Sequence, residues 1–147
     1  HFQETFTTLF EGGEADLYLT DPDNILESGV DISARPPGKK KQHLSLLSGG
    51  EKALTAIALL FSIVKAKPVP FCVLDEVEAA LDEANLLRFS AYLRTFSKTT
   101  QFIVISHRKT TMEEADALYG ITMEESGVSK MVSVKLEETE QLLEPQK

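Results

Sequence analysis

The sequence predicts an α/β fold built around a parallel strand–helix–strand unit. Residues 71–74 and 102–105 form two continuous apolar runs, which are typical of parallel strands covered on both faces. An amphipathic stretch over residues 82–96 predicts the crossover helix between them, with the usual right-handed connection. Residues 50–65 are apolar on nearly every side of a predicted helix, which should therefore be buried. Shorter alternating segments predict antiparallel strands flanking this core.

The first third of the chain predicts a helix and an antiparallel pair of strands. Residues 2–10 place apolar side chains at helical spacing and stop before Gly12 and Gly13, a typical helix end. Residues 15–19 and 30–34 alternate apolar and polar side chains, as half-buried strands do. Turn residues follow each of these runs, so the two strands are expected to pair before the buried helix begins.

The last third predicts a short helix and a hairpin. Residues 111–118 begin with Thr-x-x-Glu, the spacing of a capping box. Residues 120–123 and 131–136 predict two strands that turn near Gly127. Residues 138–147 are acidic and polar, and we expect them to form a flexible tail.

Composition and charge exclude several classes of protein. The 147 residues are 42% hydrophobic and 26% charged, as in one globular domain, and the net charge of −8 argues against a globally basic nucleic-acid surface. No apolar run approaches the roughly 18 residues of a membrane span, and residues 1–10 lack secretory-signal features. The single cysteine, Cys72, lies in an apolar run and is interpreted as a core residue of a cytosolic protein. Because the chain begins with histidine, we expect a processed or excised fragment.

Two adjacent carboxylates, Asp75 and Glu76, end the first apolar run. Open α/β folds bind ligands at the carboxyl edge of the sheet, where these side chains would lie. One carboxylate can hold hydrated Mg²⁺ while the other faces an attacking water. An ordinary acidic loop is the alternative, and this pattern alone leaves both interpretations open.

Ser48-Gly49-Gly50-Glu51 lies at the start of the predicted buried helix. Ser-x-x-Glu before an apolar helix is a capping box, which is a purely structural role. A cap does not need two glycines, however, and glycine lets a ligand approach the backbone closely. Free N–H groups at a helix start also attract anions. We interpret the segment as a helix start that caps itself and also binds phosphate.

Three further features lie near these candidates. His107 follows the second apolar run and should lie level with Asp75 and Glu76, although a lone histidine after a strand is more often a solvated loop residue. Asp82 is predicted to cap the helix that follows it. The basic run of residues 39–41 is interpreted as a solvated loop, with phosphate contact as the alternative.

Four segments occur in the order of the signature motif, Walker B strand, D-loop and switch histidine, and together they resemble the ABC-type ATPases: residues 47–52, 71–76, 80–82 and 106–107. Residues 75–85 are most similar to the corresponding run of SMC (structural maintenance of chromosomes) proteins. The resemblance to bacterial SMC heads covers about residues 10–137. Glu78 stands where many relatives carry Asp, and Ser106 where Thr is frequent.

The sequence contains no Gly-x-x-x-x-Gly-Lys-Ser/Thr pattern, the loop that cradles nucleotide phosphates. SMC-type heads carry that loop in an N-terminal segment, across a long coiled coil. The resemblance therefore implies the C-terminal lobe of an ABC-type ATPase head, formed by residues 13–137. Residues 1–12 would be the root of the returning coiled-coil helix, and residues 138–147 the flexible tail.

The resemblance also implies roles for the candidate residues, in a mechanism where two heads enclose two ATP molecules with Mg²⁺. It implies that Asp75 holds the metal, that Glu76 polarises the attacking water, and that His107 contacts the γ-phosphate or that water. The implied nucleotide-binding residues, at the seam between the two heads, are Ser48, Gly49, Gly50, Glu51 and Asp82.

The implied function is ATP-driven chromosome condensation and segregation in the cytoplasm, at the nucleoid. The implied partners are the N-terminal lobe, a second head in a homodimer, a kleisin subunit with its accessory protein, and DNA for the intact protein, with no membrane partner. One alternative is a DNA-repair ATPase with the same head. Another is a platform for kleisin docking on the strands within residues 14–34 and 119–136.

Overall fold

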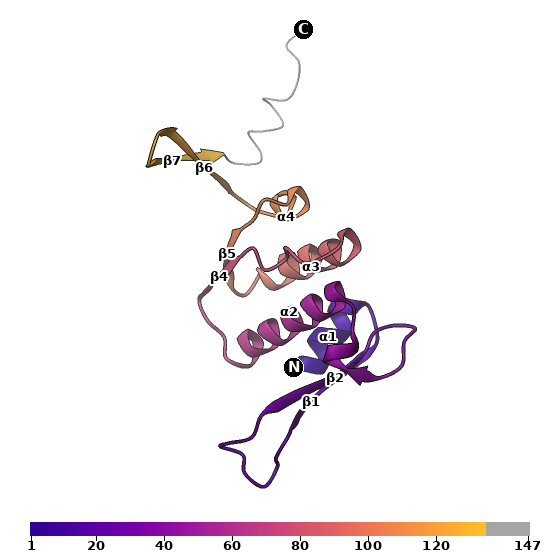
Figure 1. Ribbon diagram of the computed structural model, residues 1–147. Helices are drawn as coiled ribbons and strands as arrows, with labels where there is room; N and C mark the ends of the chain where they lie inside the picture. The colour runs from indigo at the N-terminus through magenta and orange to yellow at the C-terminus, as the bar shows by residue number, and fades with distance from the viewer. Residues whose placement is uncertain (135–147) are drawn as a thin grey trace. The chain divides into compact units, whose positions relative to one another are not determined.

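The computed structural model describes residues 1–134, which fall into two compact units, one of residues 1–107 and one beginning at Arg108. The elements of the first unit are α1 (Phe2–Phe10), β1 (Glu14–Leu19), β2 (Val30–Arg35), β3 (Gln42–His43), the 3-10 helix η1 (Leu44–Leu46), α2 (Gly49–Ala66), β4 (Phe71–Asp75), α3 (Glu83–Phe96) and β5 (Gln101–Ile105) (Figure 1). Those of the second are α4 (Lys109–Glu113), β6 (Leu118–Glu125) and β7 (Val128–Val134). The predicted strand residues 135–136 and the tail over residues 138–147 lie outside the described residues.

The helical patterns place α1, α2 and α3 around one core. Helix α1 contacts α2, α3 and β1, so the predicted N-terminal helix belongs to the first unit. Helix α2 is less completely buried than its composition suggests: Leu54 and Phe61 are fully buried, whereas Ile63 is 60% exposed. Some apolar side chains of α2 therefore have no covering element within the described residues.

The predicted antiparallel pair is present, and β3 extends it to a sheet of order β1–β2–β3. Its register aligns Ala15 with Ala34, both fully buried. At the C-terminal end of α1, the residue in the left-handed conformation is Glu11 and not a glycine. Gly13 is required for another reason: a Cβ there would lie 2.3 Å from the carbonyl oxygen of Arg35.

Strands β4 and β5 pair in parallel, and α3 connects them, which confirms the predicted strand–helix–strand unit. Leu74 is buried, and the partly buried Cys72 and Phe102 pack against the core on the same face. The rings of Phe102 and of Phe61 in α2 lie 5.9 Å apart, centroid to centroid, in an edge-on arrangement that joins helix to sheet. This face of the two strands is covered, as the sequence predicts.

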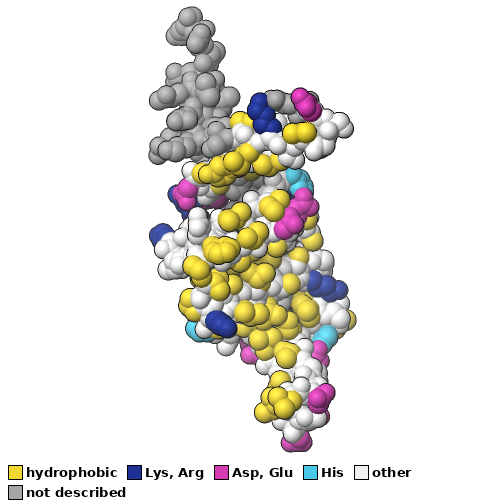
Figure 2. Space-filling model, turned by 90° about the vertical axis from the view of Figure 1, so that its left-hand side faces the viewer, with side chains coloured by type: hydrophobic (Ala, Val, Ile, Leu, Met, Phe, Trp, Pro, Cys, Tyr) yellow, Lys and Arg dark blue, Asp and Glu magenta, His cyan; other side chains and the backbone are white. Residues whose placement is uncertain are grey.

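The prediction that both faces of these strands are covered is wrong for the described chain. Figure 2 faces the side on which β4 and β5 lie in Figure 1, and hydrophobic side chains gather there over a broad patch. The period of two along the strands sends alternate side chains to this face, while the helices pack on the other. Its apolar strand residues are each at least half exposed: Phe71 (56%), Val73 (53%), Ile103 (50%) and Ile105 (50%).

In the second unit, the hairpin is confirmed and the helix is shorter than predicted. Strands β6 and β7 pair antiparallel, with Gly127 in the left-handed conformation at the turn. Helix α4 begins at Lys109, so Thr111 lies inside it and is not its N-cap. The helix ends at Glu113, and β6 starts at Leu118. None of the described helices has the length and hydropathy needed to cross a bilayer.

Candidate functional site

The carboxyl ends of β4 and β5 carry the first group of predicted residues. The parallel register pairs Asp75 with Ile105, and the backbone N–H of Glu76 donates to the carbonyl oxygen of Ile105 at 3.0 Å. His107 Nδ1 lies 3.6 Å from Glu76 Oε1, and both side chains are exposed. The predicted proximity of the histidine to the carboxylates is therefore present. At this distance the two groups interact as an ion pair when the imidazole is protonated, rather than through a hydrogen bond.

Glu76 departs from the strand with an unusual backbone. Its φ is +47°, a left-handed conformation that is strained for a residue with a Cβ. The turn is fixed by the hydrogen bond from the N–H of Glu76 to β5 and by the bond from Ala79 N–H to the carbonyl oxygen of Glu76, at 3.1 Å. Asp75 remains on the exposed strand face with Val73, and Glu76 leaves the strand in this turn. Backbone strain of this kind occurs preferentially at functional sites.

The start of α2 carries the second group. The capping box is confirmed: the N–H of Glu51 donates to Ser48 Oγ at 3.4 Å, and the N–H of Ser48 donates to Glu51 Oε2 at 3.0 Å. Ser48 Oγ also donates to Glu51 Oε2, at 2.7 Å. One carboxylate oxygen therefore accepts both hydrogen bonds from Ser48, which fixes the serine at the helix start.

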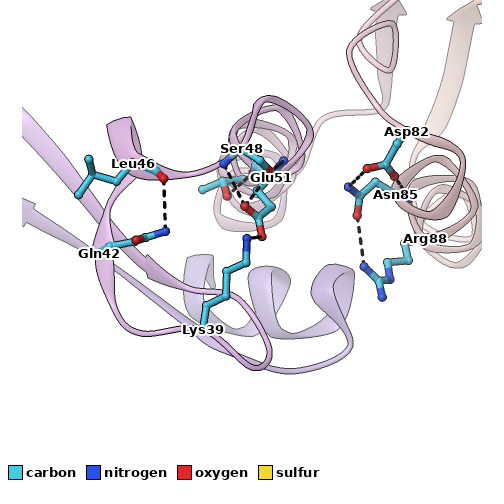
Figure 3. Close-up of polar contacts among 9 residues, drawn as sticks. Lys39, Gln42, Leu46, Ser48, Glu51, Asp82, Asn85 and Arg88 are labelled. Carbon is cyan, nitrogen blue, oxygen red and sulfur yellow. Dashed lines mark hydrogen bonds and ion pairs between the residues drawn. The ribbon is translucent and has the colours of Figure 1, made fainter.

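The other oxygen of Glu51 pairs with a lysine. Lys39 Nζ lies 2.8 Å from Glu51 Oε1 (Figure 3), while Lys41 pairs with Asp16. Burial alone would raise the pKa of Glu51, whose side chain is 14% exposed, but the hydrogen bonds from Lys39 and Ser48 outweigh burial and hold this pKa below its usual 4.5. Part of the basic run is thus bound within the protein, rather than forming only a solvated loop.

The two glycines of this group have different surroundings. A Cβ on Gly49 would meet no atom within 4 Å, so the backbone there is open to an approaching ligand. A Cβ on Gly50 would lie 3.2 Å from Asn85 Nδ2 and 3.3 Å from Asp82 Oδ2. Gly50 therefore packs closely against the start of α3, while the backbone at Gly49 is open to solvent.

Asp82 caps α3, as predicted, and begins a polar chain that sequence reasoning missed. Its Oδ1 accepts from the N–H of Asn85 at 2.9 Å, and its Oδ2 accepts from Asn85 Nδ2 at 3.1 Å. Arg88 Nη1 donates to Asn85 Oδ1 at 3.2 Å, and Arg88 Nε donates to Glu11 Oε2 at 3.2 Å (Figure 3 shows the first three residues). The spacing of Asp82, Asn85 and Arg88 marks one helix face, but no local signal points to Glu11.

Asp75 could hold a metal ion, but the described residues do not supply the other ligands that the ion needs. The described residues contain no group of three or more His, Cys, Asp or Glu side chains arranged to hold a metal ion. Mg²⁺ commonly uses one or two carboxylates and takes its remaining ligands from phosphates and water. The exposed carboxylate of Asp75 at the strand end fits that mode of binding.

The fold and these two groups of residues define a class: the chain has the fold of an SMC ATPase head. Similar solved structures are the "SMC head domain from Thermotoga maritima" (TM-score 0.74, 48% identity, covering 92% of this chain and 46% of that one) and one described as "Structural biochemistry of ATP-driven dimerization and DNA stimulated activation of SMC ATPases" (TM-score 0.84, 44% identity, covering 97% and 86%). A family model described as "RecF/RecN/SMC N terminal domain" matches residues 19–130, and the chain belongs to this family.

Relatives of known name agree with this assignment. The chain is 69% identical over 144 residues to the chromosome partition protein Smc of Bacillus subtilis, covering 98% of this chain and 12% of that protein. It is 66% identical over 136 residues to the protein of the same name from Desulfitobacterium hafniense, covering 92% and 11%. The chain thus spans about an eighth of the length of these relatives.

A third solved structure is an Smc head domain with an extended coiled coil, derived from Pyrococcus furiosus and bound to the C-terminal domain of ScpA. It matches with a TM-score of 0.81 and 45% identity, covering 97% of this chain and 36% of that one. The chain therefore corresponds to a part of that head and coiled-coil protein.

Proposed function

We propose that the chain is the C-terminal lobe of an SMC ATPase head that binds and hydrolyses ATP with Mg²⁺ between two heads. The observation that carries this proposal is the open apolar face of β4 and β5, which leads directly to Asp75 and Glu76. Four apolar side chains on that face are at least half exposed. Burying their exposed parts is worth on the order of 4 kcal/mol, which favours a second polypeptide segment on this face.

The missing segment is expected to supply the phosphate-cradling loop. The sequence has no Gly-x-x-x-x-Gly-Lys-Ser/Thr pattern, so a nucleotide bound at this site needs that loop from elsewhere. The chain covers 46% of the SMC head domain from Thermotoga maritima, which leaves room in such a head for a second lobe of similar size. The family description names an N-terminal domain; assignment to the C-terminal lobe rests on the motif order and on this absent loop.

At the β4–β5 edge, Asp75 would hold Mg²⁺, which offsets the charge of the phosphates when bound. Glu76, which leaves the strand in a left-handed turn, would orient and deprotonate the attacking water. His107, 3.6 Å from Glu76, would contact the same water or the γ-phosphate. General-base catalysis of this kind contributes about 10²–10⁴-fold to a rate.

The start of α2 would bind the nucleotide held by the opposite head. Ser48, Gly49 and Gly50 would present hydroxyl and N–H groups to the γ-phosphate, with Glu51 and Asp82 at the same seam. Open space at Gly49 supports a close backbone approach, and the helix start favours an anion. One similar structure concerns ATP-driven dimerization of SMC ATPases, which agrees with ATP joining two heads.

The relatives support a proposal for the role and the partners of the whole protein. Chromosome partition is the role that the relatives' names give, so we propose that this chain serves chromosome condensation and segregation in the cytoplasm, at the nucleoid. Two similar Smc heads are bound to ScpA, which supports docking of a kleisin subunit of that type, with its accessory protein. DNA would be a ligand of the intact protein.

The test is to measure ATP turnover by the chain alone and by a head assembled from this chain and the segment that carries the phosphate-binding loop. We expect turnover only from the assembled head, together with association of heads that depends on ATP. Ser48→Arg, which places a bulky cation at the helix start, should abolish that association. Turnover at ordinary rates by the purified chain alone, or normal association of the Ser48→Arg head, would contradict the proposal. Capture of a kleisin fragment without ATP would test docking separately.

A further inference from the structure

Lys39 lies behind the candidate phosphate contact and has no part in the function proposed above. Its Nζ pairs with Glu51 Oε1 at 2.8 Å, while Glu51 Oε2 accepts both hydrogen bonds from Ser48. The ammonium and the serine therefore bind opposite oxygens of one carboxylate. Lys40, the next residue in the chain, is exposed.

The position of Lys39 is set by a built turn. The N–H of Lys39 donates to the carbonyl oxygen of Pro36 at 3.1 Å, and Gly38 has a φ of +75°. Proline followed by a glycine with positive φ is typical of a type II turn. Few residues other than glycine adopt the positive φ that this turn requires at its second central position. Pro37 and Gly38 thus pre-organise the backbone that carries the ammonium group to Glu51.

The capping carboxylate creates an electrostatic problem for phosphate binding. Ser48 Oγ donates its one proton to Glu51 Oε2 at 2.7 Å, so a phosphate oxygen that accepts this proton in place of Glu51 would still lie only about 5 Å from the carboxylate. In a partly screened protein environment, repulsion between unit charges at that separation weakens binding on the order of 100-fold. The half-exposed ammonium of Lys39 cancels most of this repulsion. The residual effect of its removal, after solvent screening, is about 10-fold.

We propose that Lys39 is a positioning residue for the trans phosphate contact: it neutralises Glu51, so that the self-capped start of α2 accepts a triphosphate that the capping carboxylate alone would repel. This role rests on the proposed function. It differs from a direct contact with phosphate, because the ammonium acts through Glu51 and Ser48. It also differs from mere stabilisation of the helix start, because removing the negative charge of Glu51 would make the ammonium dispensable.

The experiment compares four heads, each assembled with the segment carrying the phosphate-binding loop: wild type, Lys39→Ala, Lys40→Ala and the double variant Lys39→Ala with Glu51→Gln. The ATP concentration that half-saturates association of heads, and the KM and kcat for ATP, are measured for each. We expect Lys39→Ala to raise the half-saturating ATP concentration about 10-fold. Lys40→Ala, which removes an equal charge from the same loop, should change it less than about twofold.

The double variant decides between neutralisation and support of the fold. Glutamine keeps an oxygen for the Ser48 hydrogen bonds and carries no charge, so Glu51→Gln should restore ATP affinity to the Lys39→Ala head. Equal effects of Lys39→Ala and Lys40→Ala, or a double variant as weak as Lys39→Ala while its thermal unfolding midpoint is unchanged, would overturn the role of Lys39. A wild-type head that does not associate with ATP would instead overturn the proposed function, whatever Lys39 does.

Discussion

The two groups of candidate residues differ in how much of their surroundings this chain supplies. At the start of α2, Ser48 and Glu51 satisfy each other, and Lys39 occupies the remaining carboxylate oxygen. At the ends of β4 and β5, Glu76 and His107 are exposed and approach only to 3.6 Å. The first group is assembled by contacts within the described chain, and the second lies beside an apolar face that the described chain leaves open.

This difference agrees with two separate roles in the proposed site, nucleotide binding at the start of α2 and catalysis at the ends of β4 and β5. A binding surface that acts on the nucleotide of another head must hold its shape before that head arrives, which the capping box and the Lys39 pair achieve. A catalytic edge completed by another segment needs only its backbone fixed in advance, as the hydrogen bond from Glu76 to Ile105 does. The predictions below test this contrast, beginning with the largest expected effect.

Replacing Glu76 by Gln should lower ATP turnover of the assembled head by about 100-fold or more, because the amide cannot take a proton from the attacking water. ATP-bound pairs of heads should then accumulate, and the free energy of unfolding of the chain should hardly change, since this side chain is exposed. Single-turnover kinetics and size-exclusion chromatography measure the two effects. Glu27→Gln, an exposed carboxylate in the loop between β1 and β2, is the matched control. Normal turnover by Glu76→Gln would remove Glu76 from the mechanism.

Truncation of two adjacent residues of β4 should destabilise the isolated chain to very different extents. Leu74→Ala should lower the free energy of unfolding by about 2–5 kcal/mol, because Leu74 is 2% exposed and packs in the core. Val73→Ala on the open face should lower it by less than about 1 kcal/mol. Denaturant titration measures both, and similar losses would mean that the second face is covered in solution. In the assembled head, Val73→Asp should weaken binding of the missing segment.

Replacing Asp82 by Ala should lower the free energy of unfolding by about 1 kcal/mol, since the N-cap bond to the N–H of Asn85 is lost. Asp82→Asn retains an oxygen for that bond and should cost less. Chemical denaturation of both variants measures this order. If Asn proves as harmful as Ala, the charge of Asp82, rather than its role as a cap, matters most.

The smallest expected effect is a pH dependence from Glu51. Its pKa in the folded chain lies below the usual 4.5, so the charged carboxylate stabilises the fold above about pH 4.5, and this contribution is lost as the pH falls through the folded-state pKa. The difference in unfolding free energy between wild type and Glu51→Gln should therefore be present near about pH 6 and shrink toward about pH 3. A difference independent of pH would show that the ionised form has no advantage.

Strong periodicities made most of the fold predictable. The helical spacing in residues 2–10 and the alternation of two apolar runs with an amphipathic stretch predicted α1 and the β4–α3–β5 unit, because these patterns extend over several turns or a whole strand. Thr111 and Glu114 led to a wrong prediction of where α4 starts. The Thr-x-x-Glu spacing covers only four residues, so it also occurs away from the start of a helix. Burial was overestimated for β4. An unbroken apolar run indicates that both faces of a strand avoid water, but it does not indicate whether the covering segment belongs to the same chain region.

The candidate site was predictable where its residues are close in sequence or follow two strands that are predicted to pair in parallel. The cap at Ser48 and the cap at Asp82 follow from local spacing, and His107 follows from the parallel register of two strands. The partner of Glu51 is Lys39, twelve residues earlier, and that of Arg88 is Glu11, on another helix. Such pairs depend on how elements pack, which no local pattern encodes.

The link from Arg88 to Glu11 has a mechanical consequence. It connects the residue where α1 ends to Asn85, and through Asn85 to the cap of α3. Both charged groups are partly open to solvent, and an ion pair of this kind is worth at most about 1 kcal/mol, little more than thermal energy. The link therefore ties the end of α1 only weakly to the start of α3, and its loss would leave the cap bonds between Asp82 and Asn85 in place.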